Sequence, residues 1–208
     1  MANQRRSDSP QLDLLGGLSA SSGLANSLFL ALIPDDSTRA ALEHLAHGLR
    51  QSQPSWRARW VSPARYHVTL HFLGDHEGQR PDLVAAVRAA AKQVDAGAFS
   101  WTLDQADSFH GREPPLVLRS GEVSEAMHAL WNQWRRALIL AGQGTHLSHH
   151  HTPHVTLAYG QDSQHPASSI EPLPWIANEV ALIRRVAGRH AYEILARWRL
   201  GTQETSVQ

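Results

Sequence analysis

The tetrapeptide His-Val-Thr-Leu occurs twice in this chain of 208 residues, as YHVTLH at positions 66–71 and as PHVTLA at positions 153–158. Alternate side chains of an extended strand share one face. His67 and Thr69 therefore project together, and so do His154 and Thr156. The valine and leucine of each copy point to the opposite face, where they can anchor the strand under helices.

The same alternation assigns the residues that follow each tetrapeptide. It predicts that Phe72 and Tyr159 lie on the apolar faces of their strands. It places His71 on the face of His67, either in the site or in solvent. A single such strand has a plain explanation, a half-buried strand whose polar residues face water. Two copies admit a second explanation, in which two imidazoles and two hydroxyls converge on one active site.

Two histidines and two threonines suit acid–base chemistry at phosphorus. Imidazole titrates near neutral pH, so one ring can take a proton from the nucleophile while the other protonates the leaving oxygen. Threonine hydroxyls both donate and accept hydrogen bonds and can orient an anionic oxygen. Such a site needs no metal. The histidines at positions 146, 149, 150, 151 and 154 invite a metal site, but consecutive histidines cannot all face one ion and no carboxylate is close in sequence. We expect no metal or other cofactor.

Composition excludes several other classes of protein. The chain has no cysteine, which rules out disulfides, thiolate metal sites and cysteine nucleophiles. Lys+Arg and Asp+Glu number 19 each, so there is no global basic field for long nucleic acid. No apolar run is long enough to span a bilayer. Residues 1–26 lack the apolar core of a signal peptide and are predicted as a disordered leader. We expect a cytoplasmic protein.

Strands and helices alternate along the rest of the chain. Apolar periodicity predicts strands at 28–33, 57–61, 66–73, 99–107, 116–119 and 154–159, and a hairpin of 178–186 with 190–200. It predicts helices at 35–49, 81–94 and 123–138, with Trp131 and Trp134 in the core. The Ser- and Pro-rich stretch 161–177 is predicted as a loop. Interleaved elements predict α+β or α/β lobes with helices on one face of each sheet, and one motif in each half favours a pseudo-symmetric pair.

These features resemble the 2H phosphoesterase superfamily, and most closely its RNA 2′,3′-cyclic phosphodiesterases, also called the LigT or 2′-5′ RNA ligase family. The resemblance lies in LFLALIPDD at 28–36, WVSPARYHVTLHFLG at 60–74, SFHGREPP at 108–115, PHVTLAYG at 153–160 and the closing hairpin, in the family's order. It implies an α+β fold, with one bilobal domain at 27–200 and a flexible tail at 201–208. The two pseudo-symmetric lobes are each an antiparallel-rich sheet covered by helices, around a central cleft.

The resemblance also implies an activity, the metal-independent hydrolysis of an RNA-terminal 2′,3′-cyclic phosphate to a 2′-phosphate. Carried over motif by motif, His67 becomes the proton donor and His154 the proton acceptor, and Thr69 and Thr156 bind the phosphate. The reverse reaction, 2′-5′ ligation, exchanges the roles of the two histidines.

The sequence departs from the family around the second motif. Relatives often carry an arginine shortly before this motif and another just after it. Here the residues before the motif are SHHHTP at 148–153, and the residue after Ala158 is Tyr159, so neither arginine is present. The phosphate contacts of those arginines are therefore absent or pass to the histidines at 149, 150 and 151. Further substrate contacts are predicted at Phe109, Arg112, His151 and Tyr159, with an ordinary polar loop as the alternative for the first two.

Three functions remain open from the sequence. The first is hydrolysis of cyclic phosphate at RNA ends. The second keeps the site but takes a small cyclic nucleotide or an ADP-ribose cyclic phosphate. The third is a module that binds RNA ends without turnover, although such a module has no need of two titratable imidazoles. The expected partners are RNA ends, with no membrane and no obligate protein partner, and we expect a monomer.

Overall fold

The computed structural model of the protein describes residues 26–122, 124–161 and 163–201. The leader predicted at 1–26 lies outside these ranges except for Asn26, which begins the first strand. The tail predicted at 201–208 lies outside them except for Gly201, whose backbone bonds to Ala96 and Ala98. Ordered backbone therefore extends one residue beyond the predicted domain at each end. The assignment of 27–200 to one bilobal domain stays a prediction.

The described residues form nine strands, three α-helices and one short 3-10 helix. The helices are α1 (Asp36–Ser52), η1 (Pro63–Arg65), α2 (Pro81–Ala91) and α3 (Glu125–Leu140). The strands are β1 (Asn26–Leu32), β2 (Ala58–Trp60), β3 (Val68–His76), β4 (Phe99–Ser108), β5 (Pro115–Arg119), β6 (Val155–Gly160), β7 (Ser168–Ala177), β8 (Glu179–Val186) and β9 (Glu193–Arg199).

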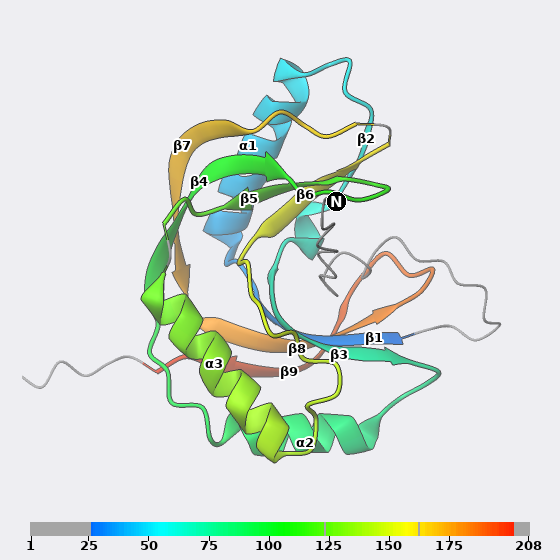
Figure 1. Ribbon diagram of the computed structural model, residues 1–208, viewed down its shortest axis with the longest axis vertical. Helices are drawn as coiled ribbons and strands as arrows, with labels where there is room; N and C mark the ends of the chain where they lie inside the picture. The colour runs from blue at the N-terminus through cyan, green and yellow to red at the C-terminus, as the bar shows by residue number, and fades with distance from the viewer. Residues whose placement is uncertain (1–25, 123, 162, 202–208) are drawn as a thin grey trace, which may run out of the picture.

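All strands join one antiparallel sheet in the order β7-β4-β5-β6-β3-β1-β8-β9, with β2 paired to β6. The two motif strands, β6 and β3, are neighbours at its centre, and the pair Val68–Val155 alone links them in the described residues. On either side the sheet splits into two halves, which Figure 1 shows one above the other. The predicted α+β fold with an antiparallel-rich sheet is confirmed.

Local chemistry at the helix starts explains where the helices begin. The Asp35 carboxylate accepts a hydrogen bond from the backbone of Thr38 at 2.7 Å, and this bond holds its pKa below the usual value. Pro81 occupies the first turn of α2, where its missing N–H is no loss. Ser124 caps α3 by accepting from the backbone of Met127 at 3.3 Å. The Asp35 and Ser124 side chains each satisfy an amide that has no partner within its own helix.

The core lies between the sheet and the helices. In β1, Leu28, Leu30 and Leu32 face this core, while Phe29 and Ala31 belong to a second apolar cluster on the other side of the sheet. The apolar face of α3 packs against the core as predicted, and the side chains of Trp131 and Trp134 are 5% and 1% exposed. Every fully buried leucine contributes about 1.5–3 kcal/mol relative to leaving it in water.

Two parts of the predicted secondary structure are wrong. Residues 168–177, predicted as loop, form β7, in which Leu173, Trp175 and Ala177 are buried at alternate positions. The strand tolerates Pro172 and Pro174 because it lies at the sheet edge, where one row of amides needs no partner. The first motif strand was expected to stop at Gly74, but β3 continues to His76, since glycine adopts the φ of 107° found there.

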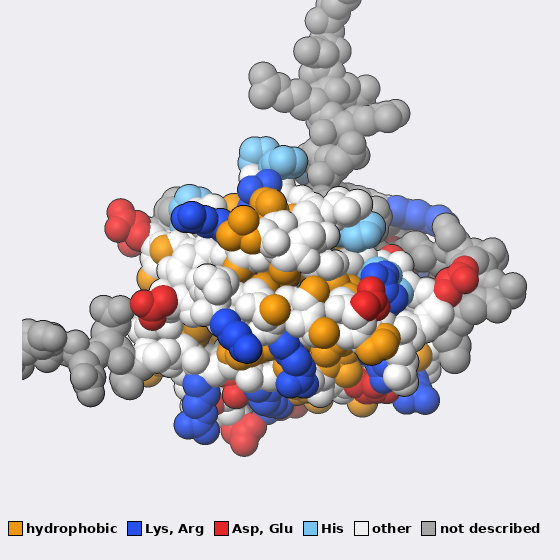
Figure 2. Space-filling model, turned by 90° about the horizontal axis from the view of Figure 1, so that it is seen from below, with side chains coloured by type: hydrophobic (Ala, Val, Ile, Leu, Met, Phe, Trp, Pro, Cys, Tyr) orange, Lys and Arg blue, Asp and Glu red, His pale blue; other side chains and the backbone are white. Residues whose placement is uncertain are grey.

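Charged side chains of both signs alternate over the surface. Figure 2, which views the molecule from below α2 as drawn in Figure 1, shows basic and acidic groups interspersed on that face. Ion pairs such as Arg184 with Glu193 and Arg197 with Glu179 balance the charge locally. Within the described residues, no helix is long and apolar enough to cross a membrane.

Candidate active site

The two motif strands carry an irregularity at the same place. In β3, Ala31 pairs with Thr69 and Leu30 pairs with His71, so Leu70 is an extra residue. In β6, Val117 pairs with Thr156 and Leu116 pairs with Ala158, so Leu157 is extra. Both are β-bulges, and each stands directly after the motif threonine. A bulge reverses the alternation of every residue beyond it.

The bulges overturn part of the predicted alternation. Phe72 was expected on the apolar anchoring face, but it packs with Phe29 on the face of His67 and Thr69, here called the site face. Tyr159 was expected opposite the catalytic residues, but its side chain hydrogen-bonds that of Thr156. Each motif therefore places a histidine on the site face, followed by a threonine two residues later and an aromatic ring five residues after the histidine.

Strand pairing brings the two sets together. Because β3 and β6 are antiparallel and Val68 lies opposite Val155, His67 and Thr156 flank this pair on one side and Thr69 and His154 flank it on the other. Directly opposed residues have Cβ atoms about 4.5–5.5 Å apart. The four predicted residues thus share one small area of the site face.

Both imidazoles are anchored in the same way. Nδ1 of His67 lies 2.7 Å from the carbonyl of Arg65, and Nδ1 of His154 lies 2.7 Å from the carbonyl of Thr152. A carbonyl only accepts, so each Nδ1 carries the proton and the neutral ring keeps Nε2 as an acceptor. The Thr69 hydroxyl lies 3.1 Å from Nε2 of His67 and donates to it.

Burial sets the charge of the pair. Loss of hydration lowers the pKa of His67 to about 4, against the opposing effect of the Arg65 carbonyl, and His154 and Arg65 lower it further by repulsion. Burial also lowers the pKa of His154. Both rings are therefore neutral in the free protein at pH 7, and they are close enough to influence each other.

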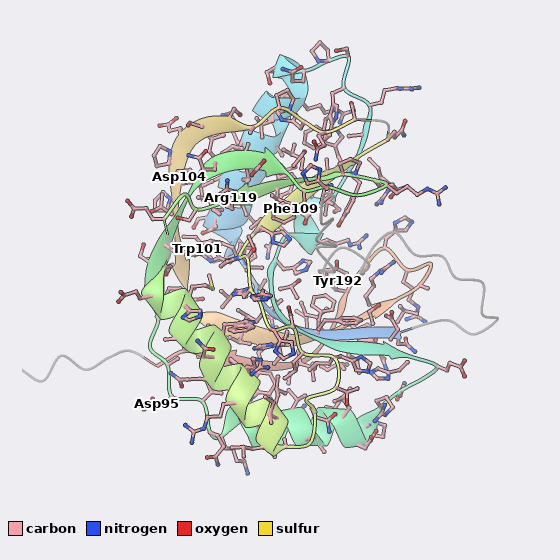
Figure 3. The ribbon with its side chains drawn as sticks, in the orientation of Figure 1. Asp95, Trp101, Asp104, Phe109, Arg119 and Tyr192 are labelled. Carbon is pink, nitrogen blue, oxygen red and sulfur yellow. The ribbon has the colours of Figure 1, made fainter. Side chains whose placement is uncertain are left out.

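An aromatic ring lies edge-on to each imidazole. Tyr192, in the turn between β8 and β9, has its ring centre 5.6 Å from that of His67. Phe109, in the loop between β4 and β5, lies 4.9 Å from His154. Figure 3 shows these two rings reaching the space between the halves of the sheet from opposite sides. Arg112 is exposed in the Phe109 loop, and its substrate contact stays a prediction. Tyr192 was predicted in the second arm of the closing hairpin at 190–200 and not as a site residue, but it precedes β9 and its ring lies against His67.

His151, in the segment just before the second motif, hydrogen-bonds the backbone of the first motif. Its Nε2 donates to the carbonyl of Thr69 at 3.1 Å, and its ring stacks on Trp131 with centres 5.5 Å apart. Burial lowers its pKa to about 4, so the ring is neutral at pH 7. Its predicted substrate contact stays a prediction. Among the residues that the structure describes, no group of three or more His, Asp or Glu side chains is placed to hold a metal.

His71 is neither in the site nor in solvent, which corrects the prediction for this residue. The bulge at Leu70 turns it toward α3, where it is 2% exposed. Its Nε2 donates to the carbonyl of Trp131 at 2.9 Å, and the indole of Trp131 donates back to the carbonyl of Leu70 at 3.0 Å. These reciprocal bonds fasten α3 to the bulge beside Thr69.

Buried neutral histidines make stability depend on pH. Burial lowers the pKa of His71 to about 4, below the value near 6.5 of the unfolded chain. Between these values the unfolded state binds more protons, so the free energy of unfolding is highest above pH 6.5 and falls toward pH 4. His71→Gln keeps a donor for Trp131 without a titration. We expect urea titrations between pH 6 and 4.5 to show that the free energy of unfolding of His71→Gln depends less steeply on pH than that of the wild type, by about 1 kcal/mol per pH unit.

The matched control is His44→Gln, the same substitution on the exposed face of α1, where no buried contact is lost. Equal slopes for wild type and His71→Gln would show that His71 does not titrate in this way.

Comparison with known proteins identifies the family of the chain. Residues 28–189 match the 2′-5′ RNA ligase superfamily, so the chain belongs to this family of 2H phosphoesterases. The RNA 2′,3′-cyclic phosphodiesterase of Bacillus subtilis (strain 168) is 32% identical over 102 residues, which are 48% of this chain and 54% of that protein. The match thus spans about half the length of that curated relative.

Solved structures share the fold. E. coli LigT complexed with 3′-AMP superposes with a TM-score of 0.64 at 24% identity, covering 86% of this chain and 99% of that chain. A protein of Thermus thermophilus superposes with a TM-score of 0.66 at 24% identity, covering 85% of this chain and 99% of that chain.

Proposed function

We propose that this protein opens the 2′,3′-cyclic phosphate at an RNA end and leaves a 2′-phosphate, with His67 and His154 as its acid–base pair. The observation that carries the proposal is the matched anchoring of the two imidazoles, each with Nδ1 on a backbone carbonyl, so that Nε2 is the acceptor on each ring. Membership of the superfamily and the likeness to the Bacillus phosphodiesterase support this substrate class.

In the proposed hydrolysis, His154 Nε2 takes a proton from water as the water oxygen bonds to phosphorus. The bond between phosphorus and O3′ breaks, and His67 Nε2 gives its proton to O3′. The negative phosphate favours the charged imidazolium and so raises the pKa of His67 on binding. The hydroxyls of Thr69 and Thr156 orient the non-bridging oxygens. Ligation runs the same steps backward with the histidine roles exchanged.

The test is product analysis in EDTA. We expect the protein to convert 2′,3′-cyclic AMP, and an oligoribonucleotide ending in a 2′,3′-cyclic phosphate, to products with a 2′-phosphate, because the two imidazoles supply both proton transfers without a metal. Phosphorus NMR distinguishes the 2′- from the 3′-phosphate. A 3′-phosphate product would contradict the assigned leaving group, and loss of turnover in EDTA would contradict the metal-free mechanism.

The same assay separates the other functions. Turnover of mononucleotides or of an ADP-ribose cyclic phosphate, but not of the oligonucleotide, would assign the site to small cyclic phosphates. Binding of the oligonucleotide with no turnover of any substrate would assign a binding module instead.

A further inference from the structure

The four motif residues supply no fixed positive charge for a phosphate. The Thr69 and Thr156 hydroxyls are neutral, and burial lowers the pKa of His67 and His154 so that both rings are neutral before substrate arrives. At the fifth position after His154, the side chain that faces the site is Tyr159, which hydrogen-bonds Thr156 and supplies no positive charge. Phosphoryl transfer concentrates negative charge on the non-bridging oxygens, and a fixed cation stabilises it.

Arg65 is a cation next to the first motif. It ends η1, and its carbonyl orients His67. Its guanidinium donates from Nη2 to the hydroxyl of Tyr192 at 3.2 Å and lies 4.7 Å from the centre of that ring. The same Tyr192 ring is edge-on to His67. The ring of Tyr192 therefore holds the Arg65 guanidinium beside the imidazole of His67. The positive charge of Arg65 lowers the pKa of His67 by repulsion.

The charge of Arg65 is uncompensated, unlike that of its neighbours. Arg59 stacks on Tyr159 at the same distance of 4.7 Å, but it is paired with Glu113 at 3.3 Å. Arg185 is attracted by Asp75. Within the described residues, Arg65 has no carboxylate partner, and its Nε is buried without a hydrogen bond. A half-buried unpaired cation is costly unless an anion joins it.

We propose that Arg65, held by Tyr192, binds the non-bridging oxygens of the cyclic phosphate from the His67 side. The assignment deepens the function proposed above and rests on it for the identity of the substrate. Arg65 is then a substrate-binding residue, and Tyr192 is a positioning residue that acts through it.

The test compares anion binding and turnover in matched variants. Arg65→Met removes the charge, Arg65→Lys keeps the charge without the planar fork, and Tyr192→Phe keeps the ring without the hydroxyl. Arg59→Met is the control, since it removes an arginine with the same stacking on a tyrosine ring but with a carboxylate partner. Binding of inorganic phosphate and of adenosine 2′-monophosphate is measured by calorimetry, and hydrolysis of 2′,3′-cyclic AMP by steady-state kinetics.

We expect Arg65→Met to weaken binding of both anions about 10-fold or more, as for loss of a hydrogen bond to a charged group. Its kcat/KM should fall by about 10²-fold, and the limb of its pH profile that His67 governs should move to higher pH, because His67 loses a repelling neighbour. Arg65→Lys and Tyr192→Phe should lie between this variant and wild type, and Arg59→Met within about threefold of wild type.

Wild-type anion affinity in Arg65→Met, or an equal loss in Arg59→Met, would overturn the assignment. If Arg65→Met does not fold, unchanged anion binding by both Arg65→Lys and Tyr192→Phe would overturn it. A wild-type protein that binds phosphate through Arg65 but does not hydrolyse the cyclic nucleotide would refute the proposed function and leave the anion site standing.

Discussion

His67→Ala and His154→Ala should each lower kcat for 2′,3′-cyclic AMP by about 10²–10⁴-fold, the usual contribution of one acid or base. The two rings act in a single step, one on the nucleophile and the other on the leaving oxygen. Residues that act as a unit are not additive, so the double variant should lose little more than either single variant. Steady-state kinetics on the three variants measures both points.

His44→Ala is the matched control, because this histidine is exposed on α1 and no substrate contact is assigned to it. It should retain wild-type kcat. The catalytic variants should unfold at wild-type or higher urea concentrations, because each removes a half-buried imidazole whose pKa is lowered in the folded state. Substantial turnover by either single variant would contradict the paired-histidine mechanism.

Trp131→Ala should have the largest effect on stability, lowering the free energy of unfolding by about 3–5 kcal/mol. The side chain is 5% exposed, it stacks on His71 and His151, and its indole holds the carbonyl of Leu70. Removal leaves a cavity and frees the bulge beside Thr69. Urea unfolding monitored by circular dichroism measures the loss.

A comparison with Trp134 on the same helix distinguishes the packing role of Trp131 from its role in positioning Thr69. It is equally buried, but its indole nitrogen has no hydrogen-bond partner within the described residues. Trp131→Phe and Trp134→Phe remove the same atoms, so both should lose stability. Only Trp131→Phe should also lower kcat, by up to about 10²-fold through misplacement of Thr69. Equal kcat in the two variants would show that the bulge needs no support from α3.

Strand alternation predicted the shared face of His67, Thr69, His154 and Thr156, because each motif is regular over its first three residues. It failed beyond Leu70 and Leu157. A bulge depends on how the neighbouring strands β1 and β5 pair with the motif strands, and no local pattern encodes this. One signal was present, an aromatic residue five positions after each histidine.

Other parts of the site and fold were missed for similar reasons. The importance of Tyr192 and Arg65 arises from a contact across 127 residues of sequence. β7 was missed because its prolines are unfavourable in a general strand and acceptable only at an edge. In each case tertiary context outweighed the local preference of the residues.

Within the described residues, Val68–Val155 is the one strand pair that joins the two halves of the sheet, and the proposed acid and base stand immediately beside it. The spacing of the two imidazoles therefore depends on one pair of residues rather than on a long ladder of backbone hydrogen bonds. The hydrogen bond from His151 to the carbonyl of Thr69 adds a second link at the same place. Any displacement of one half against the other changes the distance between acid and base directly.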